Sequence, residues 1–243
     1  TPVTENGEAL DMNKQFVRCA VFVFALTSSI IAQKDWEKTP YQSWTKNQVT
    51  VLLADSPWVK SIEFQPEGPL YTQQVGMIGP RATTARITLR SALPIRQALL
   101  RKRQLESKYD ELKESERKAF DDKNKALLDC PACKGYYVVT VVSGGLAMDN
   151  KTYVSDRKEH VFLSNDAGDR RILVEFAVLS QNDSELVFYF PRTNDKGEPL
   201  VTTTTKKLTF NFELRGLDGK TRFPFEKFSF NVADMIRDGE LLL

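Results

Sequence analysis

Alternation of apolar and polar positions predicts β-strands through most of the C-terminal half of the chain. The sharpest pattern covers residues 206–214, where Leu208, Phe210, Phe212 and Leu214 share one face. Residues 136–142 are apolar on both faces, which is typical of a central strand. Asp218-Gly219 is typical of a hairpin turn. The remaining predicted strands, separated by Gly, Asn and Asp turns, cover residues 62–64, 85–90, 160–163, 172–179, 186–190 and 223–232.

Apolar residues at helical spacing predict helices in two regions of the chain. Thr45 and Gln48 have the spacing of a capping box, and Pro57 disfavours helix just before it, so the first helix covers residues 46–54. Pro94 suits the first turn of a second helix. Apolar residues recur at helical spacing to about residue 112 and again over 115–128, which predicts a helical hairpin over residues 94–129.

These elements together predict an α+β fold: a mainly antiparallel, sandwich-like β domain with a short N-terminal helix and a long helical hairpin. Successive antiparallel strands need no crossover helices, which fits the run of strands after residue 136. We divide the chain into an N-terminal helical segment, residues 33–60, and a single α+β domain, residues 61–243. The hairpin at 94–129 is inserted into that domain.

The first 32 residues have the order of a secretory signal. A basic opening with Lys14 and Arg18 follows Met12, and an uncharged apolar run then leads to small residues ending at Ala32. We interpret residues 12–32 as a signal peptide cleaved after Ala32, and the acidic residues 1–11 as an extension of the gene model. One alternative is a genuine polar tail ahead of a buried helix. Another is an uncleaved segment that serves as a short membrane tether.

Charge and composition exclude several classes of protein. The 34 basic and 32 acidic residues are nearly balanced, which argues against a nucleic-acid partner. The hydrophobic content of 41% predicts a folded chain and not a disordered one. His160 is the only histidine, so multi-histidine metal sites are excluded, and we expect neither a metal nor a cofactor. No stable membrane span is expected after cleavage.

The pair Cys130 and Cys133 is the strongest candidate for chemistry. In an exported protein we expect a disulfide that holds the turn between the hairpin and the next strand. Thiol redox catalysis is an alternative, but a reactive first cysteine usually opens a helix, and here the pair follows one. As a zinc site the pair supplies only two of the four ligands that a structural zinc needs, and His160 is the only histidine that could add another.

Two further patterns have an ordinary interpretation and a functional alternative. Residues 165–169 resemble a calcium loop but lack its regular ligand spacing, so we interpret them as a solvated turn. The first helix of the hairpin is basic, and we interpret it as a salt-bridged, solvated face, with docking to an acidic surface as the alternative. The basic residues are Arg96, Arg101, Lys102, Arg103 and Lys108, and the acidic residues close by are Glu106, Asp110, Glu111 and Glu114.

The order of several short motifs resembles a group of uncharacterised exported bacterial proteins, several of which are labelled "GWxTD domain". The motifs are Asp35-Trp36 with Tyr41 and Trp44, Ser56-Pro57-Trp58, Ser91-Ala92-Leu93-Pro94-Ile95-Arg96, Val161-Phe162-Leu163, Phe190-Pro191-Arg192 with Gly197-Glu198-Pro199, and Asp234-Met235 with Gly239-Glu240-Leu241. The GWxTD string itself is absent. The resemblance implies export and one compact fold, and it carries no functional residue to this chain.

We therefore expect an exported envelope or periplasmic protein that acts as a non-enzymatic binding or structural module. Its partner would be an envelope protein or polymer. An exported hydrolase that uses carboxylates is the alternative, and paired acidic side chains about 5–10 Å apart in a cleft would favour it. A thiol redox protein acting through Cys130 and Cys133 is a third possibility, which strongly depressed thiol pKa values would favour.

Overall fold

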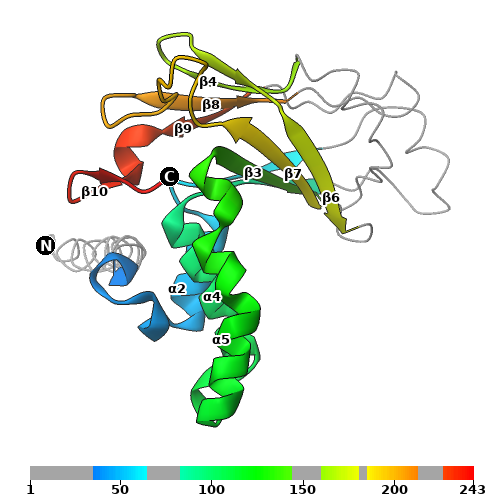
Figure 1. Ribbon diagram of the computed structural model, residues 1–243, viewed down its shortest axis with the longest axis vertical. Helices are drawn as coiled ribbons and strands as arrows, with labels where there is room; N and C mark the ends of the chain where they lie inside the picture. Colours follow the sequence, from blue (N-terminus) through cyan, green and yellow to red (C-terminus); the bar gives the residue numbers. More distant parts are fainter. Residues whose placement is uncertain (1–34, 65–82, 144–159, 181–184, 213–226) are drawn as a thin grey trace, which may run out of the picture. The chain divides into compact units, whose positions relative to one another are not determined.

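The computed structural model describes residues 35–64, 83–143, 160–180, 185–212 and 227–243 (Figure 1). The predicted signal peptide, its cleavage point at Ala32 and the predicted turn at Asp218-Gly219 lie outside the described residues. The chain divides into two compact units, residues 1–48 and 49–243, and we describe each by itself.

The described part of the first unit contains two short 3₁₀ helices, η1 (Asp35–Lys38) and η2 (Tyr41–Ser43), and the start of helix α2 (Lys46–Ala54). The indole rings of Trp36 and Trp44 meet edge to face at 5.6 Å. The Trp44 indole N–H donates to the carbonyl oxygens of Trp36 and Thr39, at 3.0 and 3.1 Å. A buried indole therefore has both an aromatic contact and acceptors for its donor.

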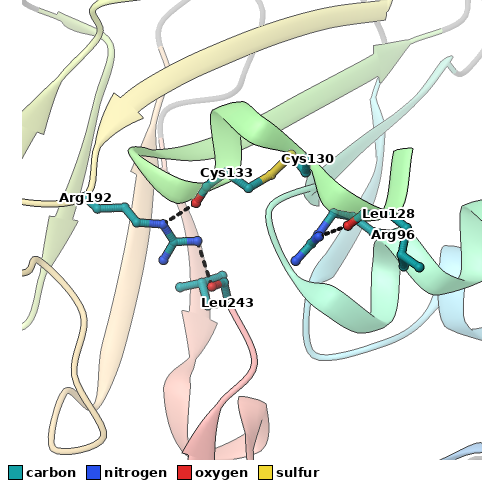
Figure 2. The surroundings of a disulfide bond; sticks show 6 residues. All are labelled: Arg96, Leu128, Cys130, Cys133, Arg192 and Leu243. Atoms are coloured by element: carbon teal, nitrogen blue, oxygen red, sulfur yellow. Dashed lines mark hydrogen bonds between the residues drawn. A yellow bond between two sulfur atoms is a disulfide. The ribbon is translucent and has the colours of Figure 1, made fainter. Parts of the chain in front are cut away.

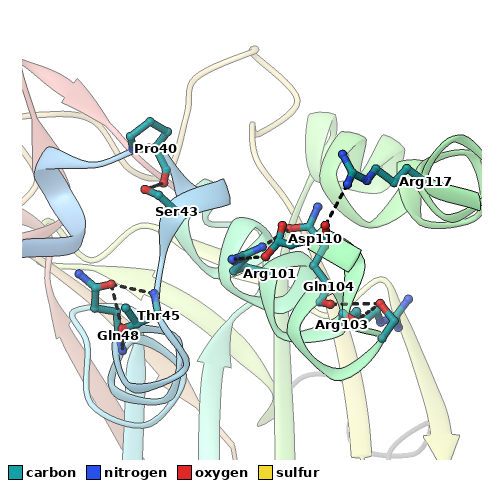
Figure 3. Close-up of polar contacts among 10 residues, drawn as sticks. Pro40, Ser43, Thr45, Gln48, Arg101, Arg103, Gln104, Asp110 and Arg117 are labelled. Atoms are coloured by element: carbon teal, nitrogen blue, oxygen red, sulfur yellow. Dashed lines mark hydrogen bonds and ion pairs between the residues drawn. The ribbon is translucent and has the colours of Figure 1, made fainter. Parts of the chain in front are cut away.

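The predicted capping box is confirmed at the start of α2 (Figure 3). The backbone N–H of Thr45 donates to Gln48 Oε1 at 2.8 Å, and the backbone N–H of Gln48 donates to Thr45 Oγ1 at 3.3 Å. The reciprocal bonds satisfy backbone donors that the first turn of a helix leaves without partners. The helix covers residues 46–54, the predicted range.

The second unit contains two antiparallel sheets, and they confirm the predicted α+β, sandwich-like fold (Figure 1). One sheet has the strand order β1-β2-β3-β7-β6, and the other has the order β5-β4-β8-β9. Their bounds are β1 Val59–Phe64, β2 Thr83–Leu89, β3 Tyr136–Ser143, β4 Phe162–Asn165, β5 Arg170–Ile172, β6 Glu175–Ser180, β7 Glu185–Pro191, β8 Lys207–Asn211 and β9 Lys227–Asn231.

Phenylalanine side chains fill the space between the sheets. Phe188 of β7 lies 5.6 Å from Phe210 of β8 and 4.9 Å from Phe212, measured between ring centroids. Phe190 lies 5.9 Å from Phe210. All four rings are buried. The alternation that predicted one apolar face on residues 206–214 therefore identified the core side of β8.

One predicted strand was wrong. Residues 172–179 were expected to form a single strand, but β5 and β6 belong to different sheets. The chain passes between them at Leu173, whose N–H donates to Val161 O, and Val174, whose N–H donates to Tyr189 O. Leu173 is 3% exposed and Val174 is 47% exposed. Apolar residues continue through the crossing, so the pattern alone does not reveal it.

The helical hairpin is confirmed as α4 (Leu93–Glu106) and α5 (Glu114–Asp129), with the 3₁₀ turn η3 (Tyr109–Glu111) between them. Tyr109 packs on Phe120 at 5.2 Å and donates to Asp121 Oδ2 at 2.8 Å. The predicted salt-bridged face is confirmed in part by pairs such as Arg101 with Asp110, at 3.2 Å (Figure 3). The other pairs on this face are Lys102 with Glu106 and Lys108 with Glu111.

The chain leaves the hairpin through η4 (Pro131–Lys134) and enters β3. After β9 it forms η6 (Val232–Met235) and a small hairpin of β10 (Ile236–Arg237) and β11 (Glu240–Leu241). Gly239, with φ of 81°, takes the left-handed conformation that this turn requires. Across the described ranges, no helix has both the length and the apolar character needed to cross a membrane.

Candidate functional site

The turn that contains Cys130 and Cys133 joins the end of α5 to β3 (Figure 2). Cys130 ends the helix in the left-handed region, with φ of 39°, and its N–H donates to Ala126 O at 3.0 Å. The N–H of Cys133 donates to Cys130 O at 2.8 Å, and the structure joins the two sulfur atoms in a disulfide. The pair therefore follows a long helix and does not open one, so it lacks the long helix N-terminus that activates redox thiols.

This turn covers the outer face of the five-stranded sheet, the face opposite the phenylalanine core. Val138 of β3 and Val187 of β7 lie on that outer face. The buried Cys133 side chain packs with both of them, and Cys130, Ala177 and Tyr189 pack around the cluster. Two residues of the turn thus serve as apolar side chains that close one end of the sheet's outer surface.

Arg192 holds the turn from one side (Figure 2). Its Nε donates to Cys133 O at 2.7 Å, and its Nη2 donates to Leu243 O at 2.8 Å. The guanidinium also lies over the Tyr137 ring, 4.7 Å from its centroid. Burial lowers the pKa of Arg192 and raises that of Tyr137, but an arginine remains charged in a protein.

Arg96 holds the turn from the other side. Its Nη1 donates to the carbonyl oxygen of Leu128, one of the last carbonyls of α5, where a cation is favourable. Burial lowers the pKa of Arg96, the nearby charge of Arg192 lowers it further, and Asp129 partly offsets both. Within the described ranges, no Asp or Glu carboxylate lies at ion-pair distance from Arg96 or Arg192. The Arg96 guanidinium therefore pairs with a neutral carbonyl.

A pocket of about 230 Å³ lies between these elements. Arg90, at the end of β2, contributes to its wall and forms an ion pair with Glu185 at 2.7 Å. Its remaining wall comes from both helices, the cysteine turn and strands β3 and β7. The lining residues are Arg90, Arg96, Ala126, Leu127, Cys130, Pro131, Ala132, Val138, Val187 and Tyr189.

The pocket lining is suited to binding more than to bond breaking. It includes no carboxylate, imidazole or aliphatic hydroxyl, and the sulfur of Cys130 is tied to Cys133. The Tyr189 phenol and the two guanidinium groups are its polar side chains. An apolar wall with a few convergent polar groups is the usual composition of a ligand pocket.

The other sequence candidates lie elsewhere. His160 is exposed just before β4. Residues 165–169 form a turn in which Asn165 Oδ1 accepts from the N–H groups of Ala167 and Asp169. Asp166 Oδ1 accepts from the N–H groups of Lys206 and Lys207, which lowers the pKa of this carboxyl. The part of the chain that the structure describes holds no group of three or more His, Cys, Asp or Glu side chains placed to bind a metal.

Sequence reasoning missed the arginines of the pocket. It placed Arg96 on the salt-bridged face of the hairpin, and this was wrong, because Arg96 turns to the end of α5 and to the pocket. Arg103 likewise bonds to Asn124 Oδ1, at 2.8 Å, and not to an acidic residue. The sequence held no direct signal for either bond, because both acceptors, Leu128 O and Asn124 Oδ1, lie on the other helix of the hairpin.

Comparisons of this chain with protein-family models, with curated proteins and with solved structures found no match. The resemblance to exported bacterial proteins therefore stays a prediction from short motifs.

Proposed function

We propose that this protein is an exported, non-enzymatic binding module of the cell envelope or periplasm, and that the pocket beside the cysteine turn is its binding site. The observation that carries the proposal is the pocket itself. It combines an apolar wall with two arginines and lacks the acidic and nucleophilic groups that catalysis needs.

Export is supported by the sequence of residues 12–32 and by the cysteine pair. A disulfide persists in oxidising compartments and is rare in the reducing cytosol. The joined sulfurs of Cys130 and Cys133 are compatible with the periplasm or the exterior. The envelope partner, whether a protein or a polymer, would present a group small enough to enter the pocket.

The two alternative functions have less support. A carboxylate-dependent hydrolase needs a pair of acidic side chains at the reacting centre, and the pocket lining supplies none. A thiol redox role needs an activated thiol, and the cysteines follow α5 instead of opening a long helix. We therefore develop only the binding proposal.

Pocket binding can be tested by NMR with three small probes that differ only in their polar end: hexanoate, hexan-1-ol and hexylamine. We expect at least one probe to shift the methyl signals of Leu127, Val138 and Val187 while leaving Leu208, in the other sheet, unchanged. Ala126→Trp should weaken the binding, because Ala126 lines the pocket and an indole occupies its space.

Ala119→Trp is the matched control, since Ala119 lies two turns earlier on α5 and is not part of the pocket lining. If no probe shifts the three methyl signals, or if both tryptophan variants behave alike, the pocket is not a binding site and the proposed function fails.

A further inference from the structure

The two arginines that line the pocket differ in their electrostatic surroundings. Arg90 is paired with Glu185, so its charge is largely balanced. Arg96 contacts the neutral carbonyl of Leu128, and no Asp or Glu carboxylate of the described residues lies at ion-pair distance from it. Asp129 offsets the charge on Arg96 only in part. The wall of the pocket around Arg96 therefore carries excess positive charge.

Arg96 also has donor capacity that the described protein does not use. A guanidinium carries five N–H donors in a planar fork. One nitrogen, Nη1, donates to Leu128 O, and Nε is buried from solvent without a partner; Nη2 makes no hydrogen bond to the described residues and is the nitrogen left for a ligand, beside Nη1. A carboxylate is the group that best matches this fork, because it accepts charge-assisted bonds from two neighbouring nitrogens.

We propose that the pocket binds a small organic acid whose carboxylate faces Arg96 and whose apolar body packs against Leu127, Val138 and Val187. This inference rests on the proposed function and adds the chemical class of the ligand. It requires an anionic end because the apolar wall cannot balance the charge on Arg96.

The size of the pocket limits the ligand. A volume of 230 Å³ equals that of about eight water molecules in the liquid, at roughly 30 Å³ each. This is below the ~300 Å³ at which pockets begin to hold drug-sized molecules. Hexanoate, with six carbons and two oxygens, has the expected size. A single guanidinium whose charge is already partly offset by Asp129 also favours the one charge of a carboxylate over the two of a phosphate.

The experiment compares the affinities of hexanoate, hexan-1-ol and hexylamine for the full-length protein by NMR titration at pH 7. We expect hexanoate to bind about tenfold or more tightly than the other two, as a charge-assisted hydrogen bond predicts. Arg96→Gln should weaken hexanoate binding by about tenfold or more and leave hexan-1-ol binding within about twofold. Arg96→Lys should fall between, because it keeps the charge and loses the planar fork.

Arg103→Gln is the matched control. Arg103 also joins α4 to α5, through Asn124, but it does not line the pocket, so this variant should bind hexanoate like the original protein. Retained hexan-1-ol binding shows that a variant is folded. If Arg96→Gln does not fold, Arg96→Lys and the three ligands with the unsubstituted protein decide the question.

Two outcomes overturn the inference. One is equal affinity for hexanoate and hexan-1-ol, and the other is unchanged hexanoate binding in Arg96→Gln. In both cases the pocket still binds, so the proposed function survives while the ligand class is wrong. If none of the three probes shifts the pocket methyl signals, the proposed function fails together with the inference.

Discussion

Three arginines that look alike in the sequence have three different roles around one turn. Arg90 forms an ion pair with Glu185, and Arg96 binds the end of α5. Arg192 joins the cysteine turn and Leu243, through hydrogen bonds from two of its nitrogens. Charge patterning suggests none of these roles, because Arg90 and Glu185 lie 95 residues apart and carbonyl acceptors leave no signal in a sequence. The roles of Arg96 and Arg192 become visible only when the fold brings distant carbonyls to them.

Arg192→Ala should destabilise the protein. The variant leaves two oxygen acceptors, Cys133 O and Leu243 O, without their charged donor and removes the guanidinium from the Tyr137 ring. Hydrogen bonds to charged groups of this kind predict a loss of about 2–4 kcal/mol in the free energy of unfolding, measured by urea denaturation. The exposed Arg86 of β2 provides the control, and Arg86→Ala should change it by less than about 0.5 kcal/mol. Equal losses in the two variants would contradict the role given to Arg192.

Tyr137 should make the protein lose stability in alkali. Burial raises the pKa of its phenol above the ordinary value, and its oxygen accepts from the Val201 N–H at 3.2 Å. The unfolded chain releases this proton at about pH 10, whereas the folded chain holds it to higher pH. Stability is therefore complete below about pH 10 and falls as pH rises from there through the folded pKa.

The measurement is urea unfolding between about pH 9 and pH 11. Tyr137→Phe cannot ionise at this position, so its stability should fall less steeply over that interval than that of the original protein. Contributions that the two proteins share cancel in the comparison. If the two proteins lose stability equally over this pH interval, burial of the Tyr137 phenol is not the cause of the loss.

At the scale of elements, the sequence correctly predicted those helices and strands that interactions between neighbouring residues determine. The helix at 46–54 was predicted to the residue, because its capping box and the following proline are sequence-local signals. The hairpin and the paired β8 and β9 were predicted for the same reason. The crossing from β5 to β6 was missed, since the choice of sheet depends on partners far away in the sequence.

The pocket could not be predicted from these patterns. Its wall draws on the end of β2, on α4, on α5, on the cysteine turn and on β3 and β7, so no single stretch of sequence contains it. The cysteine pair was the one part that the sequence identified. Its position after a helix was also predicted, and that position makes Cys130 part of the pocket wall.

Reduction of the cysteine turn should weaken both the fold and the pocket. The disulfide closes a loop of four residues, for which chain entropy predicts a stabilisation of about 2 kcal/mol. Cys130, Pro131 and Ala132 line the pocket, so a looser turn should also weaken hexanoate binding. Urea unfolding and hexanoate titration with and without a phosphine reductant measure the two effects.

The Cys130→Ser/Cys133→Ser variant is the control for reduction. It keeps only Cys19, so added reductant should change neither its stability nor its affinity. If full reduction to thiols changes neither the stability nor the hexanoate affinity of the unsubstituted protein, the disulfide does not support the turn.

At the scale of the whole molecule, the sandwich of two sheets is the scaffold that holds the proposed site. The phenylalanine core stabilises the two sheets against each other, and it leaves the outer face of the larger sheet for the hairpin and the cysteine turn. The hairpin contributes the pocket at its base, where α4 begins and α5 ends. The rest of the hairpin carries salt-bridged, exposed side chains.

Export, the last prediction, connects residues 12–32 to the state of the cysteines. Protein isolated from its host should begin near Gln33 or Lys34, as N-terminal mass spectrometry would show. The reason is that the apolar run is too short to span a bilayer and has basic residues only in front of it. Replacing Val23 by aspartate within that run should block processing, whereas Asn47→Asp, in the mature chain, should not.

The same samples test the redox argument. Exported protein should resist alkylation at Cys130 and Cys133 until it is reduced, because an oxidising compartment keeps them joined. Protein retained by Val23→Asp should react with the alkylating reagent directly at both residues. A mature chain that still contained residues upstream of Met12 would remove the case for export. Cys130 and Cys133 would then be free thiols, and no covalent bond would hold this part of the pocket wall.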